Sequence, residues 1–419
     1  MSQSTPLKAF AFIFVGLVIL FTLGQFQRMG GGVIAAHLSQ ELALPAATLG
    51  GVMSAYFFAS SLAQLPVGVL IDRYGPRAVL PAFGLLGAIG CAVFALAQDP
   101  IGLIVGRAAL GGGFAAVMIG AFVVFARWVP QDRFSTISSI FGFISGLACL
   151  AATTPLAVAL DRYGRENTFL VLTSITLFGA ILAFAVIRDR PPGQAKPTGA
   201  PTTLLDSLRG VMAVLRHPAT PSLSPMAFVT YIPLGSLGAM WLGPYLGSVH
   251  DLDATDRGNV IFIVLLAWNL GLGAYGPIDR WLGNRKRLIL TTSAVAVTLF
   301  IGLATLPNPS LGVVVPWVVA IYLATPTYLI FMAHCRAIYP DHLTGRALTF
   351  FNLVAIMGVA IAQLGFGFIV GQFQDGHGHT DPDAYRFVFG TLGILIGIAA
   401  MVYVRAPDVT VTATKDAIP

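Results

Sequence analysis

The chain has 419 residues, of which 56% are hydrophobic and only 10% are charged, and its mean hydropathy is +0.81. A soluble domain carries about 25% charged residues, so this composition excludes a soluble globular protein. The formal charge of +6 does not indicate nucleic-acid binding, because the basic residues lie in short loops and at the ends of apolar runs and form no patch. The composition predicts a protein that crosses a membrane many times.

Twelve apolar runs are long enough to cross a bilayer, which takes about 20 residues. They cover residues 9–36, 48–71, 78–97, 101–126, 136–160, 168–187, 223–249, 258–278, 288–306, 311–335, 347–371 and 386–404. With both termini in the cytoplasm, most of the 24 Lys and Arg residues are cytoplasmic, as the positive-inside rule requires. The external basic residues are then Arg162, Arg165, Arg257 and Arg386. We therefore predict an all-α membrane protein with twelve transmembrane helices and cytoplasmic termini.

A linker divides the chain into two halves of six spans each. Residues 189–222 begin with a stretch rich in Pro, Gly and Arg, which is typical of a flexible connection. Within them, apolar residues recur at helical spacing between Leu204 and Leu215, which predicts a short amphipathic helix on the membrane surface. The expected organisation is an N-terminal half (1–188), a linker (189–222), a C-terminal half (223–405) and a cytoplasmic tail (406–419).

One loop sequence occurs twice, each time between the second and third run of its half. The first copy reads Gly68-Val-Leu-Ile-Asp72-Arg73-Tyr-Gly75-Pro-Arg77, and the looser second copy reads Gly276-Pro-Ile-Asp279-Arg280-Trp-Leu-Gly283-Asn-Arg285-Lys286-Arg287. A repeat at half the chain length is typical of two parallel six-span halves. The first copy resembles the signature Gly-x-x-x-Asp-Arg-x-Gly-x-Arg of the major facilitator superfamily. This resemblance implies two pseudo-symmetric six-helix halves and solute transport by alternating access.

The resemblance also implies a gate at the first loop. The gating residues would be Gly68, Asp72, Arg73, Gly75 and Arg77, with Asp132 as a candidate partner of the arginines and with Asp279 and Arg280 as the counterpart in the second copy. Asp72 would face the N-terminus of the eleventh span, where unpaired N–H groups favour an anion. In the second copy, Tyr275 replaces the first glycine and Gly283 comes one position late, which speaks against a matching latch. Alternatively these charges only set the topology, and we prefer that interpretation for Arg285, Lys286 and Arg287.

Arg28 is the first candidate for binding substrate. The sequence Phe26-Gln27-Arg28-Met-Gly-Gly-Gly-Val33 resembles the first span of the anion:cation symporter branch, in which an arginine binds the carboxylate or phosphate of the substrate. A guanidinium presents a planar fork that matches such groups. Gln25 and Gln27 flank Arg28 and could add hydrogen bonds. The alternative is that Arg28 extends to the outer interface of the membrane.

Arg107 is the candidate for a second positive centre. The sequence Arg107-Ala-Ala-Leu-Gly111-Gly-Gly113 resembles the fourth-span motif of the superfamily, whose glycines allow close helix packing. A charge in the membrane costs roughly 2.5–3.5 kcal/mol on insertion scales and usually faces a cavity. The alternative is a structural arginine whose N–H groups are satisfied by carbonyls. The other expected substrate-binding residues lie in later spans and are Tyr231, Trp241, Asn269, Tyr328, Asn352 and Gln363.

No carboxylate lies in the middle of a predicted span, since all 18 acidic residues fall in loops or at span ends. We therefore expect neither a cationic substrate nor proton coupling through an embedded carboxylate. Anion exchange, facilitated diffusion, and a proton carried by the substrate or by His37 or His334 all remain open. His377 and His379 could bind a metal only in an unconstrained external loop, and the three cysteines are not spaced as a metal site, so no metal or cofactor is expected.

These patterns predict a transporter of a small organic anion. Its partners would be an anionic small molecule and the lipid bilayer, without nucleic acid, and we expect a monomer. The sequence contains no nucleophile–base pair or phosphate-binding loop, so an enzyme is not expected. One rival is a carrier for a larger amphiphile such as a siderophore or drug, and another is a transporter-like sensor that moves nothing. Short loops suggest a bacterial inner membrane, with an organelle membrane as the alternative.

Overall fold

The computed structural model describes residues 4–191, 203–375 and 380–408. The regular elements in these ranges are helices, apart from an isolated bridge between Gln374 and Thr380. They are α1 (Ser4–Met29), α2 (Gly31–Glu41), α3 (Ala46–Tyr74), α4 (Pro76–Leu96), α5 (Pro100–Trp128), α6 (Gln131–Ala151), α7 (Thr154–Val186), α8 (Leu204–Leu215), α9 (Thr220–Thr230), the π-helix η1 (Pro233–Trp241), α10 (Leu242–His250), α11 (Ala254–Leu282), α12 (Arg285–Thr305), α13 (Leu311–Ala324), α14 (Tyr328–Ile338), α15 (Asp341–Gln372) and α16 (Pro382–Tyr403).

Within the described ranges, 11 helical segments are long and apolar enough to cross a membrane. Each overlaps one of the expected runs, so the all-helical membrane class is confirmed. The run expected at 136–160 differs, because it is divided between a shorter apolar helix, Ile140–Ala151, and the start of α7. The rest of that run belongs to α7. This helix is kinked at Gly164, whose φ of 72° is a backbone conformation that residues with an L side chain rarely adopt.

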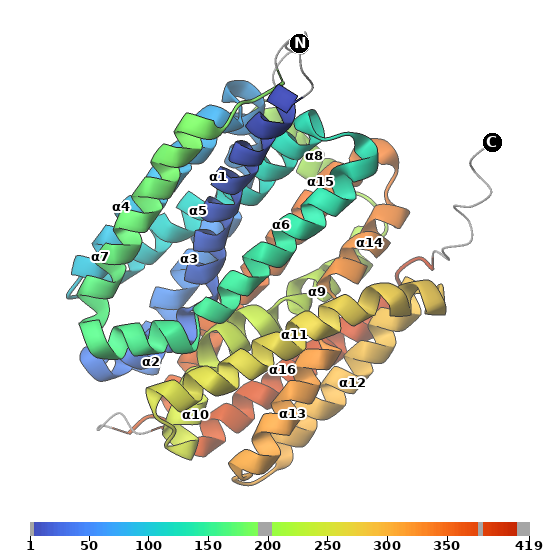
Figure 1. Ribbon diagram of the computed structural model, residues 1–419. Helices are drawn as coiled ribbons and strands as arrows, with labels where there is room; N and C mark the ends of the chain where they lie inside the picture. Colours follow the sequence, from blue (N-terminus) through green and yellow to red (C-terminus); the bar gives the residue numbers. More distant parts are fainter. Residues whose placement is uncertain (1–3, 192–202, 376–379, 409–419) are drawn as a thin grey trace. The chain divides into compact units, whose positions relative to one another are not determined.

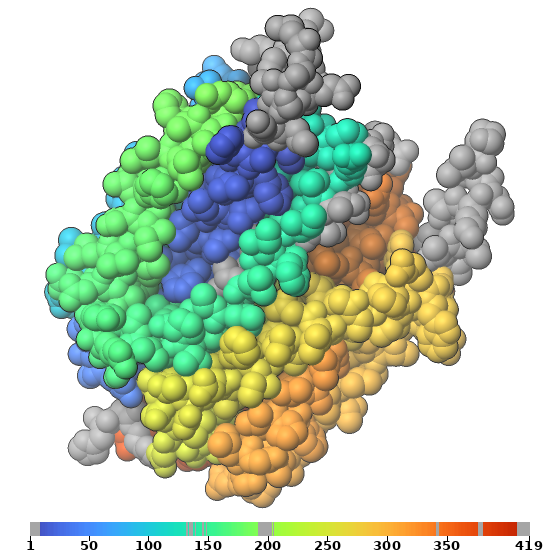
Figure 2. Space-filling view, viewed as in Figure 1, coloured from blue at the N-terminus to red at the C-terminus, as the bar shows by residue number. Residues whose placement is uncertain are grey.

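The helices group into two compact units by their contacts. Unit 1 comprises Met1–Gly30 and Ala55–Ser207, and unit 2 comprises Gly31–Ser54 and Leu208–Pro419. In unit 1, α4 packs against both α5 and α7, and α1 packs against α5, α6 and α7 (Figure 1). In unit 2, α12 packs against α16 and α11 against α13. The side chains of α11 (yellow) and α13 (orange) lie in contact in Figure 2.

Glycines permit the closest helix packing in unit 1. A Cβ added to Gly113 of α5 would lie 2.6 Å from Cα of Gly87 in α4, and one on Gly106 would lie 2.7 Å from the N of Phe94. A Cβ on Gly111 would lie 2.6 Å from the carbonyl carbon of Tyr56 in α3. The glycines of the Arg107 motif therefore bring α5 into backbone contact with two helices, as small residues do in membrane bundles.

Besides the run at 136–160, which is divided between α6 and α7, three of the apolar runs are broken rather than continuous. The first run passes from α1 to α2 at Gly30, the seventh contains α9, η1 and α10, and the tenth passes from α13 to α14 through residues 325–327. Pro233 and Pro326 lie at two of these breaks and explain part of this, because proline donates no backbone hydrogen bond. Breaks free backbone polar groups inside a membrane, so side chains must satisfy them. The candidate site residues lie close to these breaks.

The segment α8 lies where the sequence predicted an amphipathic helix. Its apolar side chains are exposed along one stripe, at Leu205, Leu208, Met212 and Leu215. Val214, on the opposite side, is buried, and the side chain of Arg346 in α15 covers Gly210. One face of α8 thus packs against other residues of unit 2, and its apolar face is exposed.

Candidate functional site

Arg28 occupies the last turn of α1, directly before the break at Gly30. Since the chain continues as α2 to Glu41, Arg28 lies within the first apolar run and not at its end. Its side chain is half-buried, and the guanidinium carbon lies 5.5 Å from the ring centroid of Phe57. The C-terminal end of a helix and an aromatic face both favour a cation. The break therefore provides a favourable position for this charge.

Arg107 lies in the neighbouring helix α5 and caps the C-terminal end of α1. Its side chain is fully buried, and Nη1 donates a hydrogen bond of 3.1 Å to the carbonyl oxygen of Gln27, one of the carbonyls left without an intrahelical partner. The guanidinium carbon lies 5.1 Å from the ring centroid of Tyr56. The atoms Nε and Nη2 have no hydrogen-bond partner within the described ranges. Arg107 thus combines a structural cap with unsatisfied donors.

The two glutamines beside Arg28 face different ways. Successive helical residues are about 100° apart, so Gln25 shares the face of Arg28, whereas Gln27 points elsewhere. Gln27 is buried, and its Nε2 lies 3.5 Å from Sγ of Cys91 in α4. Its Oε1 has no hydrogen-bond partner in the described part of the chain. The structure therefore brings Arg107 to Gln27 at the end of α1, whereas Arg28, the next residue, lies on another face of the helix beside Phe57.

Unit 2 gathers aromatic and amide side chains at its own helix breaks. The ring centroid of Tyr231 lies 5.5 Å from that of Tyr328 and 6.5 Å from that of Trp268, and the hydroxyl of Tyr328 donates to Oδ1 of Asn352. We call these four residues the aromatic cluster. Three of them were expected from the sequence. Trp268 was not, because a tryptophan inside an apolar run looks like an ordinary core residue, and its exposed neighbour Asn269 bonds only the carbonyl of Leu265 in its own helix.

Gln363 and Tyr322 hold the π-helix η1. Nε2 of Gln363 donates a 2.8 Å hydrogen bond to the carbonyl of Gly235, and the hydroxyl of Tyr322 donates one of 2.6 Å to the carbonyl of Pro233. Both side chains are buried. Trp241, at the end of η1, is also buried, and its ring forms no stacking pair with the rings of the aromatic cluster among the described residues. The structure gives Gln363 a backbone partner, and the prediction that Gln363 and Trp241 bind substrate together with Tyr231 stays a prediction.

The first loop copy meets an acidic residue that sequence reasoning did not name. Oδ1 of Asp189 accepts a 2.8 Å hydrogen bond from the backbone N of Arg77 at the start of α4. Gly75 has φ of 82°, and a Cβ there would lie 2.6 Å from Cγ of Asp189. Asp72, Arg73 and the Arg77 side chain are exposed, and the side chain of Asp132 lies outside the described residues. The signal was present, because Asp189 stands between two arginines at the end of the sixth run.

The second loop copy contains its own ion pair. Nε of Arg285 lies 3.1 Å from Oδ2 of Asp279, and Nη1 of Arg285 donates to the carbonyl of Ala333. Gly283 is the C-cap of α11 and has a φ of 64°. The side chain of Arg280 is exposed. Arg285 therefore connects the start of α12 to the last turn of α11 and to the middle of α14, in addition to any role in topology.

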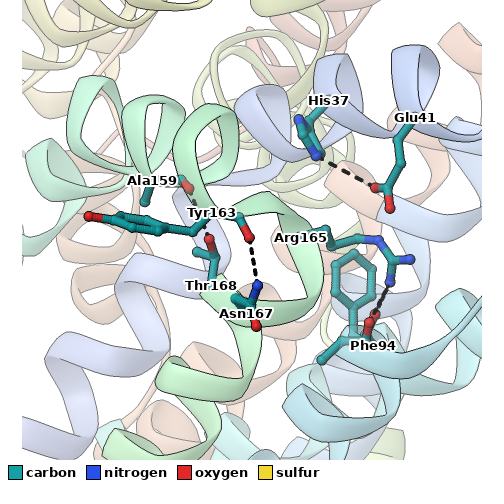
Figure 3. Close-up of polar contacts among 9 residues, drawn as sticks. His37, Glu41, Phe94, Ala159, Tyr163, Arg165, Asn167 and Thr168 are labelled. Atoms are coloured by element: carbon teal, nitrogen blue, oxygen red, sulfur yellow. Dashed lines mark hydrogen bonds and ion pairs between the residues drawn. The ribbon is translucent and has the colours of Figure 1, made fainter.

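Other polar candidates have local partners (Figure 3). Nε2 of His37 lies 3.6 Å from Oε2 of Glu41 within α2. Nη1 of Arg165 donates to the carbonyl oxygens of Phe94 and Ala95 at the end of α4, and Thr168 and Asn167 bond carbonyls on the far side of the Gly164 kink. His334 is buried between the hydroxyl of Tyr403 and the carbonyl of Pro407.

Metal ligands are not clustered in the described part of the chain. No group of three or more His, Cys, Asp or Glu residues is arranged there to hold a metal ion. Cys91, Cys149 and Cys335 are buried and free. His377 and His379 lie outside the described residues.

Similarity to known proteins agrees with this architecture. A gentisate transporter of Corynebacterium glutamicum is 23% identical, over 89% of this chain and 83% of its own length. A hexuronate transporter of Escherichia coli K12 is also 23% identical, over 93% of this chain and 94% of its own length. The crystal structure of the nucleoside transporter NupG has a TM-score of 0.72 at 13% identity and covers 94% of this chain and 100% of that one. The family model of the Major Facilitator Superfamily matches residues 16–334. The chain therefore belongs to the Major Facilitator Superfamily of membrane transporters.

Proposed function

We propose that the protein transports a small organic anion and that Arg28 binds the carboxylate of the substrate. The observation that carries this proposal is the position of Arg28, half-buried at the break of the first span and within one turn of the carbonyl that Arg107 caps. Neither α1 nor α5 contains an acidic residue. Two guanidinium groups in such a setting attract an anion, because an opposite charge offsets the cost of holding them in the membrane.

The relatives support the same class of substrate. Gentisate and hexuronates are different molecules, one aromatic and one a sugar acid, but each carries a carboxylate and several hydroxyl groups. We infer that the carboxylate binds Arg28, with Gln25 beside it and with Arg107 as a second positive centre behind Gln27. The hydroxyl and amide groups of Tyr231, Tyr328 and Asn352 would bind the uncharged part of the substrate.

The arrangement of spans and halves is part of the proposal. We propose twelve spans, with the fifth formed by α6 and the first part of α7, and with both termini in the cytoplasm of a bacterial cell whose inner membrane holds the protein. The two halves, 1–188 and 223–405, would alternate in exposing the substrate site to the two sides. The loop containing Asp72, Arg73 and Arg77 would gate this motion, with Asp189 as its partner in the same unit.

A thermal-shift screen tests the substrate class. The purified parent protein and Arg28→Gln are heated with gentisate, glucuronate, acetate, inorganic anions and siderophores. A ligand at a hundredfold excess over its dissociation constant stabilises the native state by about 2.7 kcal/mol. We expect an organic anion to raise the midpoint of the parent and not of Arg28→Gln, and the same anion to enter proteoliposomes that contain the parent.

Arg162→Gln is the matched control, because Arg162 is an exposed arginine of the same unit. It should respond to the anion as the parent does. The proposal fails if Arg28→Gln responds equally, or if only bulky amphiphiles stabilise the parent, which would favour a carrier for siderophores or drugs. Binding without any uptake would favour a sensor.

A further inference from the structure

A cavity of about 310 Å³ lies within unit 2, among α2, α10 and the adjoining ends of α3, α11, α15 and α16. Its lining includes no residue of the aromatic cluster. Known ligand pockets occupy roughly 300–1,000 Å³, so this cavity is large enough for a small molecule. In the topology proposed above, it faces the external side of the membrane. We call it the Arg257 cavity.

Arg257 gives the cavity a positive charge. The side chain is half-buried, and its Nε donates a 3.2 Å hydrogen bond to the backbone carbonyl of Asp253. Among the described residues, no carboxylate oxygen lies within ion-pair distance of Arg257. A Cβ added to Gly247 would lie 2.6 Å from Nη1, so the glycine provides the space in which the guanidinium lies. The negative charge of Asp253, which is exposed, attracts the guanidinium from a distance, but the described residues give Arg257 no direct ion pair.

The other external arginines are used differently. Arg165 is buried and donates to two backbone carbonyls at the end of α4. Nη1 of Arg386 lies 2.7 Å from Oδ1 of Asp383, and Arg162 is exposed to solvent. External basic residues are unfavourable for topology, and Arg165 and Arg386 each have a structural partner that offsets this. For Arg257 the structure offers the cavity.

Trp241 also lines the cavity and carries an unpaired donor. Its side chain is 1% exposed, and its Nε1 is buried without a hydrogen-bond partner in the described part of the chain. A buried indole N–H normally has a partner, and a small rotation of this side chain would bring the donor to a ligand in the cavity. Gln374 and Ser248 also line the cavity, but they already bond other residues. Asp251 also lines the cavity but is exposed, so solvent screens its charge.

We propose that the Arg257 cavity is a second binding site, which takes the carboxylate of a small organic anion. A guanidinium and an indole N–H are both donors, and charge-assisted bonds from arginine to a carboxylate are among the strongest in proteins. The proposal rests on the proposed function only for the class of ligand. It adds a site on the external side of unit 2, whereas Arg28 belongs to unit 1.

Protection of an introduced cysteine tests this site. Ser39 is exposed and lines the cavity, and the three native cysteines are buried, so Ser39→Cys provides a single reactive thiol. We would measure the rate of its labelling by a membrane-impermeant maleimide in gentisate, glucuronate or acetate, with chloride at equal ionic strength as reference. At least one carboxylate should slow the labelling. Adding Arg257→Gln should raise the concentration for half-protection about tenfold or more, and Trp241→Phe should raise it less.

Two further variants separate this site from the substrate site. Arg162→Gln, which removes an exposed arginine of unit 1, should leave the protection unchanged, and Arg28→Gln should leave it unchanged even though it abolishes the thermal response to substrate. The second site is overturned if no carboxylate protects the introduced thiol in the Ser39→Cys protein, if adding Arg257→Gln leaves the protection intact, or if adding Arg28→Gln removes it. Protection only by transported anions assigns the cavity to capture of substrate, whereas protection by anions that are not taken up assigns it to a separate effector.

Discussion

Helices α3 and α15 cross at Gly50 and Gly367, where their backbones are in direct contact. A Cβ on Gly50 would lie 2.9 Å from the carbonyl oxygen of Gln363 and 3.0 Å from Cα of Gly367. Close by, Oε1 of Gln374 accepts a 2.8 Å hydrogen bond from the backbone N of Ala46, the first residue of α3. The first turns of α3 are therefore fixed on α15 by contacts that only a residue without a side chain permits.

The first prediction concerns this crossing. Gly50→Ala should lower the thermal midpoint of the purified protein, because the added methyl meets backbone atoms that cannot yield, and overpacking costs about 1–3 kcal/mol. Gly51→Ala is the matched control, since a Cβ at Gly51 meets nothing within 4 Å. The control should be neutral or slightly stabilising, because alanine favours a helix over glycine by about 1 kcal/mol. Equal midpoints for the two variants would contradict the crossing.

The second prediction concerns the support of the π-helix. Gln363→Leu leaves the carbonyl of Gly235 without its partner inside the membrane, and an unsatisfied buried polar group costs about 1–3 kcal/mol. The thermal midpoint should fall, and uptake of the transported anion should fall with it. Tyr322→Phe should act in the same direction through the carbonyl of Pro233. Asn269→Leu is the control, because Asn269 is exposed and bonds only its own helix.

A loss of stability with Asn269→Leu as large as that with Gln363→Leu would contradict this interpretation of the π-helix. The comparison also separates two roles for Gln363. If it only supports η1, the variant should keep its affinity for the anion in the fraction that remains folded. If it binds substrate as the sequence suggested, the affinity should fall even where the midpoint does not.

The sequence predicted the spans better than the way they break. Hydropathy and charge asymmetry depend on long runs, and the 11 described helices that meet the criteria for a span all overlap expected runs. The breaks at Gly30, at 231–233 and at 325–327 leave hydropathy almost unchanged, and only Pro233 and Pro326 mark two of them in the sequence. The kink at Gly164 depends on one backbone angle, and the division of the run expected at 136–160 lies at residues 152–153, between α6 and α7.

The candidate site was predictable where residue type alone is informative. A charge inside an apolar run, such as Arg28 or Arg107, is visible in the sequence. Contacts between distant positions are not, so the sequence could not show that Arg107 caps Gln27, that Gln363 bonds Gly235, or that Trp268 rather than Asn269 joins Tyr231. Asp189 was missed for a related reason, because its partner is a backbone N–H more than a hundred residues away.

The third prediction concerns the packing that positions Arg107. Gly111→Ala would place a Cβ within 2.6 Å of the carbonyl carbon of Tyr56, so α5 must move away from α3. We expect a loss of about 1–3 kcal/mol or more and a weaker thermal response to the anion, because Arg107 lies one turn away on the same helix. Gly112→Ala is the matched control, since its Cβ would meet only a Leu86 methyl at 3.8 Å. The prediction fails if Gly111→Ala is as stable as Gly112→Ala.

The fourth prediction concerns the loop between α3 and α4. Gly75 has φ of 82° and ψ of 158°, a region that only glycine enters freely, and strain there costs about 1–3 kcal/mol for other residues. Gly75→Ala also brings its methyl to 2.6 Å from Cγ of Asp189, so the bond from the N of Arg77 to Asp189 should be lost. The thermal midpoint should fall in Gly75→Ala and stay unchanged in Gly68→Ala, whose Cβ would meet nothing within 4 Å.

A double-mutant cycle divides that loss into strain and contact. Asp189→Ala alone should cost less than Gly75→Ala, because it removes one cap from α4 without straining the loop. Since the strain at Gly75 remains when Asp189 is absent but the clash does not, the double variant should be less destabilised than the sum of the two single variants. Strict additivity would mean that Gly75 and Asp189 act independently. If Gly75→Ala kept its stability but lost uptake, the folded state would tolerate the change. The loop would then act in the motion of the gate and not in the stability of the fold.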